Sequence, residues 1–156
     1  MSLVTTDWLF NNLNNVKIID SSWHLPNQNR NANKEYLDEH IINSIFFDID
    51  KNSDQKSHLP HMLPKTEEWE KILSNLGISN KDKIVIYDNS DLISSCRCWY
   101  SFLYFGHDPS LVSVLNGGLK KWKQEGKPVV NHITKISKTY YSAKENKGMV
   151  KSKIEI

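Results

Sequence analysis

The two cysteines, Cys96 and Cys98, are the only thiol nucleophiles that this chain of 156 residues offers. Their segment has the apolar pattern of a helix from about Cys96 to Phe105, and helical positions two apart point about 200° away from each other. The two thiols therefore cannot form a Cys-x-x-Cys redox pair or chelate one metal ion. We expect one of them to pack in the core, and a catalytic role for either stays open as the less favoured alternative.

Three histidines close together in the sequence raise the question of a transition-metal site. His58 and His61 are three positions apart, and His40 and several aspartates lie not far away. However, Pro60 lies between the first two and breaks the helix that would place both imidazoles on one face. We therefore favour a single functional histidine in an ordered loop over a metal site.

An acidic run, DIDKNSD at residues 48–54, places oxygen side chains at positions 1, 3, 5 and 7 of a calcium-binding loop. Position 6 of such a loop needs glycine and holds Ser53 here. Position 12 needs a bidentate glutamate and holds Leu59. The sequence therefore predicts no calcium site.

Asp88 ends the strongest predicted strand and begins a loop that runs into a helix. Loops of this kind in α/β proteins form anion cradles from their backbone amides. A carboxylate at this position repels an anionic substrate, and the amides can hold the carboxylate itself. The loop thus has the shape of an anion site but carries a side chain of the wrong charge.

The elements that must position these residues alternate along the chain. Strands are expected at 16–20, 44–47, 83–88 and 111–115, and helices at 6–13, 34–39, 66–76, 96–105 and 119–125. This alternation predicts a parallel α/β sheet with right-handed crossovers, and residues 48–65, with two prolines, are expected to form a long ordered loop. Because ligands of such sheets bind beyond the carboxyl ends of the strands, the chemistry is expected in the loops that follow them.

Composition is that of one ordinary globular domain, with 38% hydrophobic and 24% charged residues and a formal net charge of +2. No apolar run approaches the roughly 18 residues of a membrane span, and the N-terminus lacks the pattern of a secretion signal. Two cysteines two positions apart cannot form a disulfide framework. The sequence therefore predicts a cytoplasmic protein with no membrane partner.

The positive charge is concentrated at one end, since residues 119–156 contain ten lysines and only three acidic residues. Such a segment can bind nucleic acid. The chain has only two arginines, Arg30 and Arg97, whereas bidentate contacts to phosphate and guanine prefer arginine. We therefore predict a solvated basic segment and no nucleic-acid partner.

Eight segments in this order and spacing resemble the N-terminal domain of the two-domain sulfurtransferases, the rhodanese and 3-mercaptopyruvate sulfurtransferase family. They are DSSWHLP (20–26), RNANKEYLDEHI (30–41), FFDID (46–50), LPHMLP (59–64), LGIS (76–79), IVIYD (84–88), FGHD (105–108) and LNGGLKKWKQEGKPV (115–129). The resemblance implies a rhodanese-like three-layer α/β fold, with a central parallel sheet flanked by helices. It also implies a rhodanese-like domain at 1–135, followed at 136–156 by a linker and the start of a second domain that is missing.

In this family the catalytic cysteine belongs to the second domain and directly follows the strand that corresponds to IVIY. Asp88 occupies that place here, so the chain is expected to contain no catalytic residue. The resemblance implies the non-catalytic half of an enzyme that moves sulfur from 3-mercaptopyruvate or thiosulfate to a thiol or cyanide acceptor through a cysteine persulfide. It implies no metal and no organic cofactor.

The resemblance also bears on the substrate. Mercaptopyruvate-type members carry a histidine before Met-Leu-Pro, as His61 does here, whereas thiosulfate-type members usually have an apolar residue. In the former type this histidine and the aspartate that corresponds to Asp50 line the active site at the domain interface. An imidazole can bond a substrate carboxylate or a proton-transferring water, and an aspartate can orient the imidazole. Two exposed loop residues without a function are the simpler alternative.

The chain departs from the family pattern at two places. Residues 39–43 read Glu-His-Ile-Ile-Asn where members often have Gly-His-Ile-Pro-Gly, and residues 116–118 read Asn-Gly-Gly instead of Asp-Gly-Gly. A second hypothesis is a stand-alone, non-catalytic rhodanese-like module that binds a partner protein. A phosphatase-like relative would need a longer, cysteine-headed loop ending in arginine, and nothing after Tyr87 supplies one.

Overall fold

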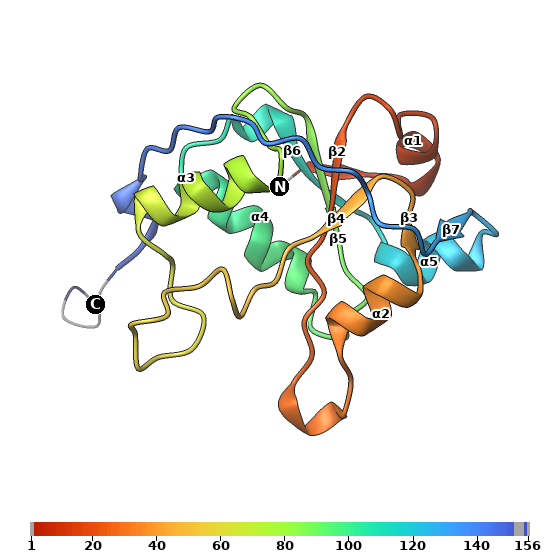
Figure 1. Cartoon of the computed structure of the whole chain (residues 1–156), viewed down its shortest axis with the longest axis horizontal. Coiled ribbons are helices and arrows are strands. Elements are labelled where there is room, and N and C mark those ends of the chain that lie inside the picture. Colours follow the sequence, from red (N-terminus) through yellow and green to blue (C-terminus); the bar gives the residue numbers. More distant parts are fainter. Residues whose placement is uncertain (1, 152–154, 156) are drawn as a thin grey trace.

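A parallel five-stranded sheet forms the centre of the computed structural model, which describes residues 2–151 and 155 (Figure 1). Its strands, in spatial order, are β1 (Ser2–Val4), β6 (Val112–Leu115), β5 (Ile84–Tyr87), β2 (Lys17–Asp20) and β4 (Ser44–Phe46). All neighbouring strands pair in parallel. The four predicted strands are confirmed, and β1 is an additional edge strand that the sequence pattern did not indicate.

Helices cover both faces of the sheet, as the predicted three-layer α/β fold requires. They are α1 (Thr6–Phe10), α2 (Ala32–Asp38), α3 (Thr66–Asn75), α4 (Ser94–Tyr104) and α5 (Gly118–Gln124). A short antiparallel pair, β3 (His40–Ile41) with β7 (Val129–Val130), and three 3-10 turns, Pro26–Gln28, Pro109–Leu111 and Lys147–Met149, complete the described elements.

Two helices begin earlier than the sequence pattern indicates because polar side chains cap them. The side chain of Asn31 accepts a hydrogen bond from the backbone N–H of Lys34 at 2.9 Å, so α2 begins at Ala32 and not at residue 34. The α4 helix likewise begins at Ser94, because the Asp88 carboxylate accepts a hydrogen bond from the backbone N–H of Ser95.

The core is divided by the sheet into two clusters, and the strands feed both in alternation. In β5, Ile84 and Ile86 pack with Trp69 of α3 and with residues of α4. The residue between them, Val85, points to the opposite face and packs with Trp122 of α5. All five side chains are at least 99% buried, so β5 is a fully buried central strand, as its continuous apolar sequence predicts.

The backbone conformation explains how Asn43 can replace the glycine that the family often has at this position. Asn43 has φ = 66°, in the left-handed region where the family often has glycine. Asparagine enters this region more easily than other residues with a side chain. The turn between β3 and β4 is therefore kept although its glycine is not.

After β7, residues 131–150 form an extended strap that runs back across the domain to α3 and α4 (Figure 1). Tyr141 of the strap is 1% exposed, and its ring stacks on His107. The Thr139 N–H donates to the Ser74 carbonyl at 3.0 Å. Thus the described part of the segment predicted as a linker packs on the domain, whereas residues 152–154 and 156 lie outside the described residues.

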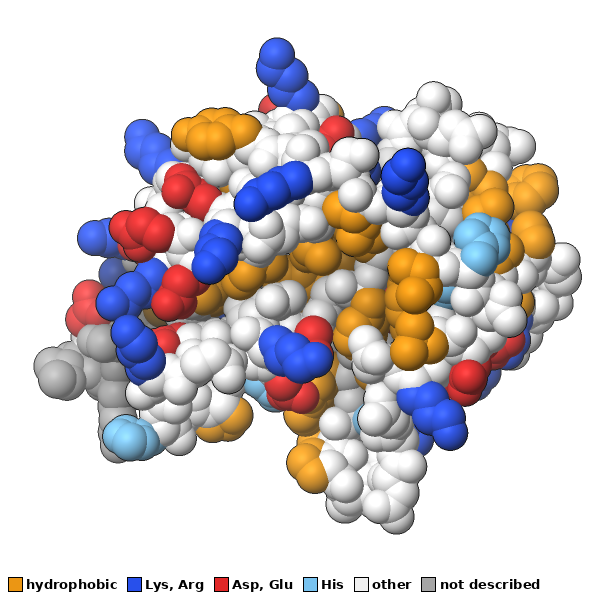
Figure 2. Space-filling model, in the orientation of Figure 1, with side chains coloured by type: hydrophobic (Ala, Val, Ile, Leu, Met, Phe, Trp, Pro, Cys, Tyr) orange, Lys and Arg blue, Asp and Glu red, His pale blue; other side chains and the backbone are white. Residues whose placement is uncertain are grey.

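Charged side chains of both signs are interspersed on the face shown in Figure 2, so the lysine and arginine side chains form no continuous basic patch on that face. Within the described part of the chain, none of the helices combines the length and the hydrophobicity needed to cross a membrane.

Candidate functional site

Three loops meet beyond the carboxyl ends of the strands, at the lower edge of the sheet in Figure 1. We call them loop A (residues 21–31, after β2), loop B (residues 47–65, after β4) and loop C (residues 88–93, after β5). The ends of parallel strands in an α/β sheet are where ligands bind. The side chains that these loops bring together therefore define the candidate site.

Asp50 and His61, which the sequence singles out eleven residues apart in loop B, lie side by side. The His61 Nε2 is 2.6 Å from the Asp50 Oδ1, and the Asp50 side chain is 64% exposed. A carboxylate only accepts hydrogen bonds, so the imidazole donates from Nε2, and Nδ1 is the ring nitrogen that is not bonded to the carboxylate. The pair is thus an accessible imidazole oriented by a carboxylate, the arrangement that general acid–base catalysis uses.

Trp23, from loop A, completes what we call the Trp23–Asp50–His61 cluster. Its indole N–H donates to the Asp50 Oδ1 at 3.0 Å, and its ring meets the His61 ring edge to face with centroids 4.8 Å apart. The sequence patterns do not single out this residue. Its only signal is its place three positions after the end of β2, inside the segment DSSWHLP that carries the family resemblance.

Arg97, whose role the sequence left open, anchors loop B to α4. Its guanidinium donates to the backbone carbonyl oxygen of His61 at 2.5 Å. His61 itself has φ = 55°, a left-handed conformation that a non-glycine residue adopts only where its surroundings hold it. Arg97 supplies one such contact and thereby fixes the loop from which the imidazole projects.

Asp88 directly follows β5, and one amide of the start of α4 and one amide of loop C hold its carboxylate. The Oδ2 accepts from the Ser95 N–H at 2.7 Å, the Oδ1 accepts from the Ser90 N–H at 3.3 Å, and the residue is 8% exposed. The sequence predicts this arrangement, in which backbone amides hold the carboxylate. A carboxylate thus occupies the amide cradle, as a capping residue does at a helix N-terminus.

The packing around Asp88 requires a glycine on the neighbouring loop. Gly118 has φ = 57°, and a Cβ there would lie 2.5 Å from the Asp88 carbonyl oxygen. That oxygen accepts from the Leu119 N–H at 2.9 Å. Residue 118 must therefore lack a side chain for the loop after β6 to close on loop C.

Both thiols lie on α4 and neither is activated. Cys98 is 1% exposed, in agreement with the expectation that one cysteine packs in the core, and burial raises its pKa far above the ordinary range. Burial, followed by the nearby Asp88 carboxylate, also raises the pKa of Cys96. Because the thiolate is the nucleophile, these surroundings disfavour sulfur chemistry at either position.

A second carboxylate, Asp20, is buried at the end of β2 and 2% exposed. Its Oδ1 accepts hydrogen bonds from the Ser22 N–H at 2.9 Å and the Ser22 hydroxyl at 2.6 Å. Burial, to which the Asp88 carboxylate adds, raises the pKa of Asp20 to about 6. No pattern in the sequence indicates that burial raises the pKa of this strand-ending aspartate.

The three histidines considered for a metal site lie in different surroundings. His40 is fully buried and its ring nitrogens lie 2.6 Å and 3.1 Å from the carbonyl oxygens of Tyr36 and His132, whereas His58 is exposed. In residues 2–151 and 155 the structure contains no group of three or more His, Cys, Asp or Glu side chains suited to a metal ion.

Comparison with known proteins identifies the family. The sequence matches the family described as "Rhodanese-like domain" over residues 5–125. It is 45% identical over 126 residues to "Thiosulfate/3-mercaptopyruvate sulfurtransferase 1, mitochondrial" of Arabidopsis thaliana, covering 80% of this chain and 33% of that protein. It is 36% identical over 143 residues to "3-mercaptopyruvate sulfurtransferase" of Mus musculus, covering 90% and 48%. The chain thus spans a third to a half of these relatives.

Solved structures agree with the sequence comparison. The crystal structure of SseA from Escherichia coli, whose title describes the rhodanese fold and catalytic mechanism of 3-mercaptopyruvate sulfotransferases, superposes with a TM-score of 0.87 at 32% identity. The superposition covers 94% of this chain and 57% of that one. Tum1 protein from Saccharomyces cerevisiae gives a TM-score of 0.81 at 28% identity, covering 93% and 50%.

Proposed function

Because the chain belongs to the rhodanese-like domain family, we propose that it is the non-catalytic, N-terminal half of a 3-mercaptopyruvate-type sulfurtransferase. The observation that carries this proposal is the hydrogen-bonded pair of Asp50 and His61, which lies beyond the carboxyl ends of the strands. Asp88, held by amides where the family has its nucleophile, and the two unactivated thiols support a non-catalytic role.

In the proposed reaction, a cysteine thiolate of the second domain attacks the sulfur of 3-mercaptopyruvate. The carbon–sulfur bond breaks, its electron pair moves to C3 to form the enolate of pyruvate, and C3 then takes up a proton equivalent to the one lost from the substrate sulfur. The transferred sulfur stays on the enzyme as a persulfide. An acceptor thiolate attacks the outer sulfur, which leaves as a new persulfide and regenerates the cysteine thiolate.

His61 moves the proton in this scheme. With Nε2 bonded to Asp50, Nδ1 accepts the proton of the substrate thiol and returns one to the enolate carbon, which is general acid–base catalysis by one imidazole. Asp50 stabilises the imidazolium that exists between the two steps, and the Trp23 indole keeps the carboxylate in place. The strap of residues 131–150 is, in this proposal, the connection that leads to the second domain.

The isolated chain of 156 residues is expected to form no persulfide with 3-mercaptopyruvate, because Asp88 replaces the nucleophile and both thiols have raised pKa values. The measurement is persulfide labelling together with pyruvate release from the purified chain. The matched control is Cys96→Ser, which is expected to give the same background signal. Turnover by the chain that disappears in Cys96→Ser would place the nucleophile on α4 and contradict the proposal.

A further inference from the structure

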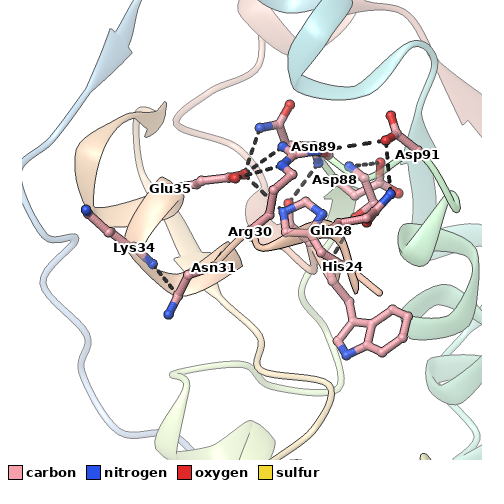
Figure 3. Close-up of polar contacts among 12 residues, drawn as sticks. His24, Gln28, Arg30, Asn31, Lys34, Glu35, Asp88, Asn89 and Asp91 are labelled. Carbon is pink, nitrogen blue, oxygen red and sulfur yellow. Dashed lines mark hydrogen bonds and ion pairs between the residues drawn. The ribbon is translucent and has the colours of Figure 1, made fainter. Parts of the chain in front are cut away.

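Glu35, in α2, lies outside the Trp23–Asp50–His61 cluster, and its carboxylate joins loop A to loop C (Figure 3). Its Oε1 accepts from Arg30 Nε and its Oε2 from Arg30 Nη2, both at 2.8 Å. The same Oε2 lies 3.0 Å from His24 Nε2 and 3.2 Å from the side-chain amide nitrogen of Asn89. Arg30 and His24 belong to loop A and Asn89 to loop C, so one carboxylate holds both loops.

Only an acceptor can fill this position. The guanidinium of Arg30 and the amide nitrogen of Asn89 are donors, and a ring nitrogen that faces a carboxylate donates as well. The other ring nitrogen of His24, Nδ1, is buried and has no hydrogen-bond partner within the described part of the chain, so Glu35 provides the hydrogen bond that holds this ring. Burial by itself raises the pKa of Glu35, but the hydrogen bonds from Arg30 and His24 outweigh burial and lower it.

Further contacts continue from Glu35 into the seam between the loops. Arg30 Nη2 also donates to the Asn89 carbonyl oxygen at 3.1 Å, and the Asn89 N–H donates to the Ser22 hydroxyl at 2.8 Å. One residue further along each loop, the Trp23 N–H donates to the Ser90 hydroxyl at 2.9 Å. Loops A and C are therefore fastened at Arg30 and at two successive positions.

The second of these positions is Trp23, the residue that loop A contributes to the cluster. The backbone of Trp23 is held by loop C, while its indole N–H donates to Asp50 and its ring contacts His61. A rotation of the Trp23 backbone would displace the indole from the carboxylate, because the indole N–H is fixed relative to the backbone by two side-chain torsions. The orientation of the indole thus depends on how loop A is set against loop C.

We propose that Glu35 is a positioning residue for the Trp23–Asp50–His61 cluster, acting through Arg30, His24 and Asn89 to set loop A against loop C. Glu35 touches none of the three cluster residues in this role. The consequence for turnover rests on the proposed function of the cluster, whereas the consequence for the geometry of Trp23 does not.

The test is hydrogen exchange of the Trp23 indole N–H, followed by NMR on the full chain and assigned with Trp23→Phe. In Glu35→Gln the side-chain NH₂ group faces at least one of the donors around it, so a hydrogen bond is lost there. Loop A is then held less firmly against loop C, and the hydrogen bond from the Trp23 indole to Asp50 is expected to open more often. Exchange of this indole is expected to be about tenfold faster, while the indoles of Trp69 and Trp122 in the two core clusters keep their rates.

Glu125→Gln is the matched control. Glu125 is also a partly exposed carboxylate that accepts hydrogen bonds from several donors, Thr6 and Lys127 among them, and it lies next to α5, outside loops A, B and C. This variant removes the same charge and is expected to leave the Trp23 indole unchanged. Equal exchange of the Trp23 indole in the wild type and in Glu35→Gln, or an equal acceleration in Glu125→Gln, would overturn the proposal.

Arg30→Lys keeps the test decisive if Glu35→Gln does not fold. Lysine keeps the charge but lacks the planar fork that binds Glu35 and the Asn89 carbonyl together, so a smaller acceleration of the same indole is expected. An unchanged indole in a folded Arg30→Lys chain would then refute the positioning role. Turnover of 3-mercaptopyruvate by the longer protein is a separate readout, and an altered indole with unchanged turnover would refute the proposed function of the cluster alone.

Discussion

Replacing Asp20 by asparagine is expected to raise the free energy of unfolding by about 3 kcal/mol at about pH 8. Asp20 lies at the end of β2 and is only 2% exposed. Burial disfavours the ionised carboxylate and raises its pKa from an ordinary value of 3.8 to about 6. Asparagine has the same shape and can still accept the hydrogen bonds from Ser22, but it carries no charge that must be desolvated.

The pH dependence fixes the sign of this effect. Between the ordinary pKa of 3.8 and the folded-state pKa of about 6, the folded protein binds more protons at Asp20 than the unfolded chain does. The wild type therefore loses stability as the pH rises through this interval, and the loss is complete above it. The advantage of Asp20→Asn should accordingly be near zero below about pH 4, grow up to about pH 6 and then stay constant. Urea unfolding at a series of pH values measures it.

Asp88→Asn is the matched control, since Asp88 is also a buried aspartate at the carboxyl end of a strand and directly follows β5. Its carboxylate caps α4 through the Ser95 N–H, so asparagine is expected to cost about 1–2 kcal/mol at neutral pH. The two substitutions should thus act in opposite directions. A destabilised Asp20→Asn chain at about pH 8 would show that Asp20 contributes hydrogen bonds worth more than its desolvation costs.

In the two-domain enzyme that we propose, Asp50→Asn is expected to lower kcat/KM for 3-mercaptopyruvate about a hundredfold. The asparagine can still accept from Trp23 and His61, so the imidazole keeps its place. What is lost is the negative charge that stabilises the imidazolium during proton transfer. The loss is expected in kcat more than in KM, because in the proposed reaction the imidazolium of His61 forms during turnover and not on substrate binding.

Asp48→Asn provides the comparison for this measurement. Asp48 lies two residues away in the same loop, and its Oδ2 is 3.2 Å from the Lys51 Nζ. Among the described interactions it has no contact with His61. Its replacement removes the same charge from loop B and is expected to change kcat/KM less than about threefold. If Asp48→Asn and Asp50→Asn are equally impaired, the effect belongs to the net charge of loop B and the assigned role of Asp50 is wrong.

Short-range patterns in the sequence were sufficient for the core of the fold. The apolar run at β5 and the periodicity of α3 and α4 depend on neighbours within a few residues, and the structure confirms them. The edge strand β1 and the pair of β3 with β7 have three and two residues each, too short for a periodic pattern, and exist because a partner strand lies beside them.

The candidate site likewise combines residues that the sequence singles out with contacts that only the structure shows. Residue type and family resemblance were enough to single out Asp50, His61 and Asp88, because their chemistry is evident at a strand end or in a loop. The partnership of Trp23 with Asp50 and the raised pKa of Asp20 were not foreseen. These properties arise from contacts between separate loops and from burial.

The sequence by itself therefore determined the central strands and the helices, the family that the chain resembles and the loops in which we expect the chemistry. The tertiary structure alone decided that the Glu35 carboxylate meets Asn89, 54 residues further along the chain, and that the Trp23 indole N–H meets a carboxylate 27 residues further on. The physical reason is that hydrogen-bond partners and desolvation depend on distance in space, which strand order sets and local sequence does not record.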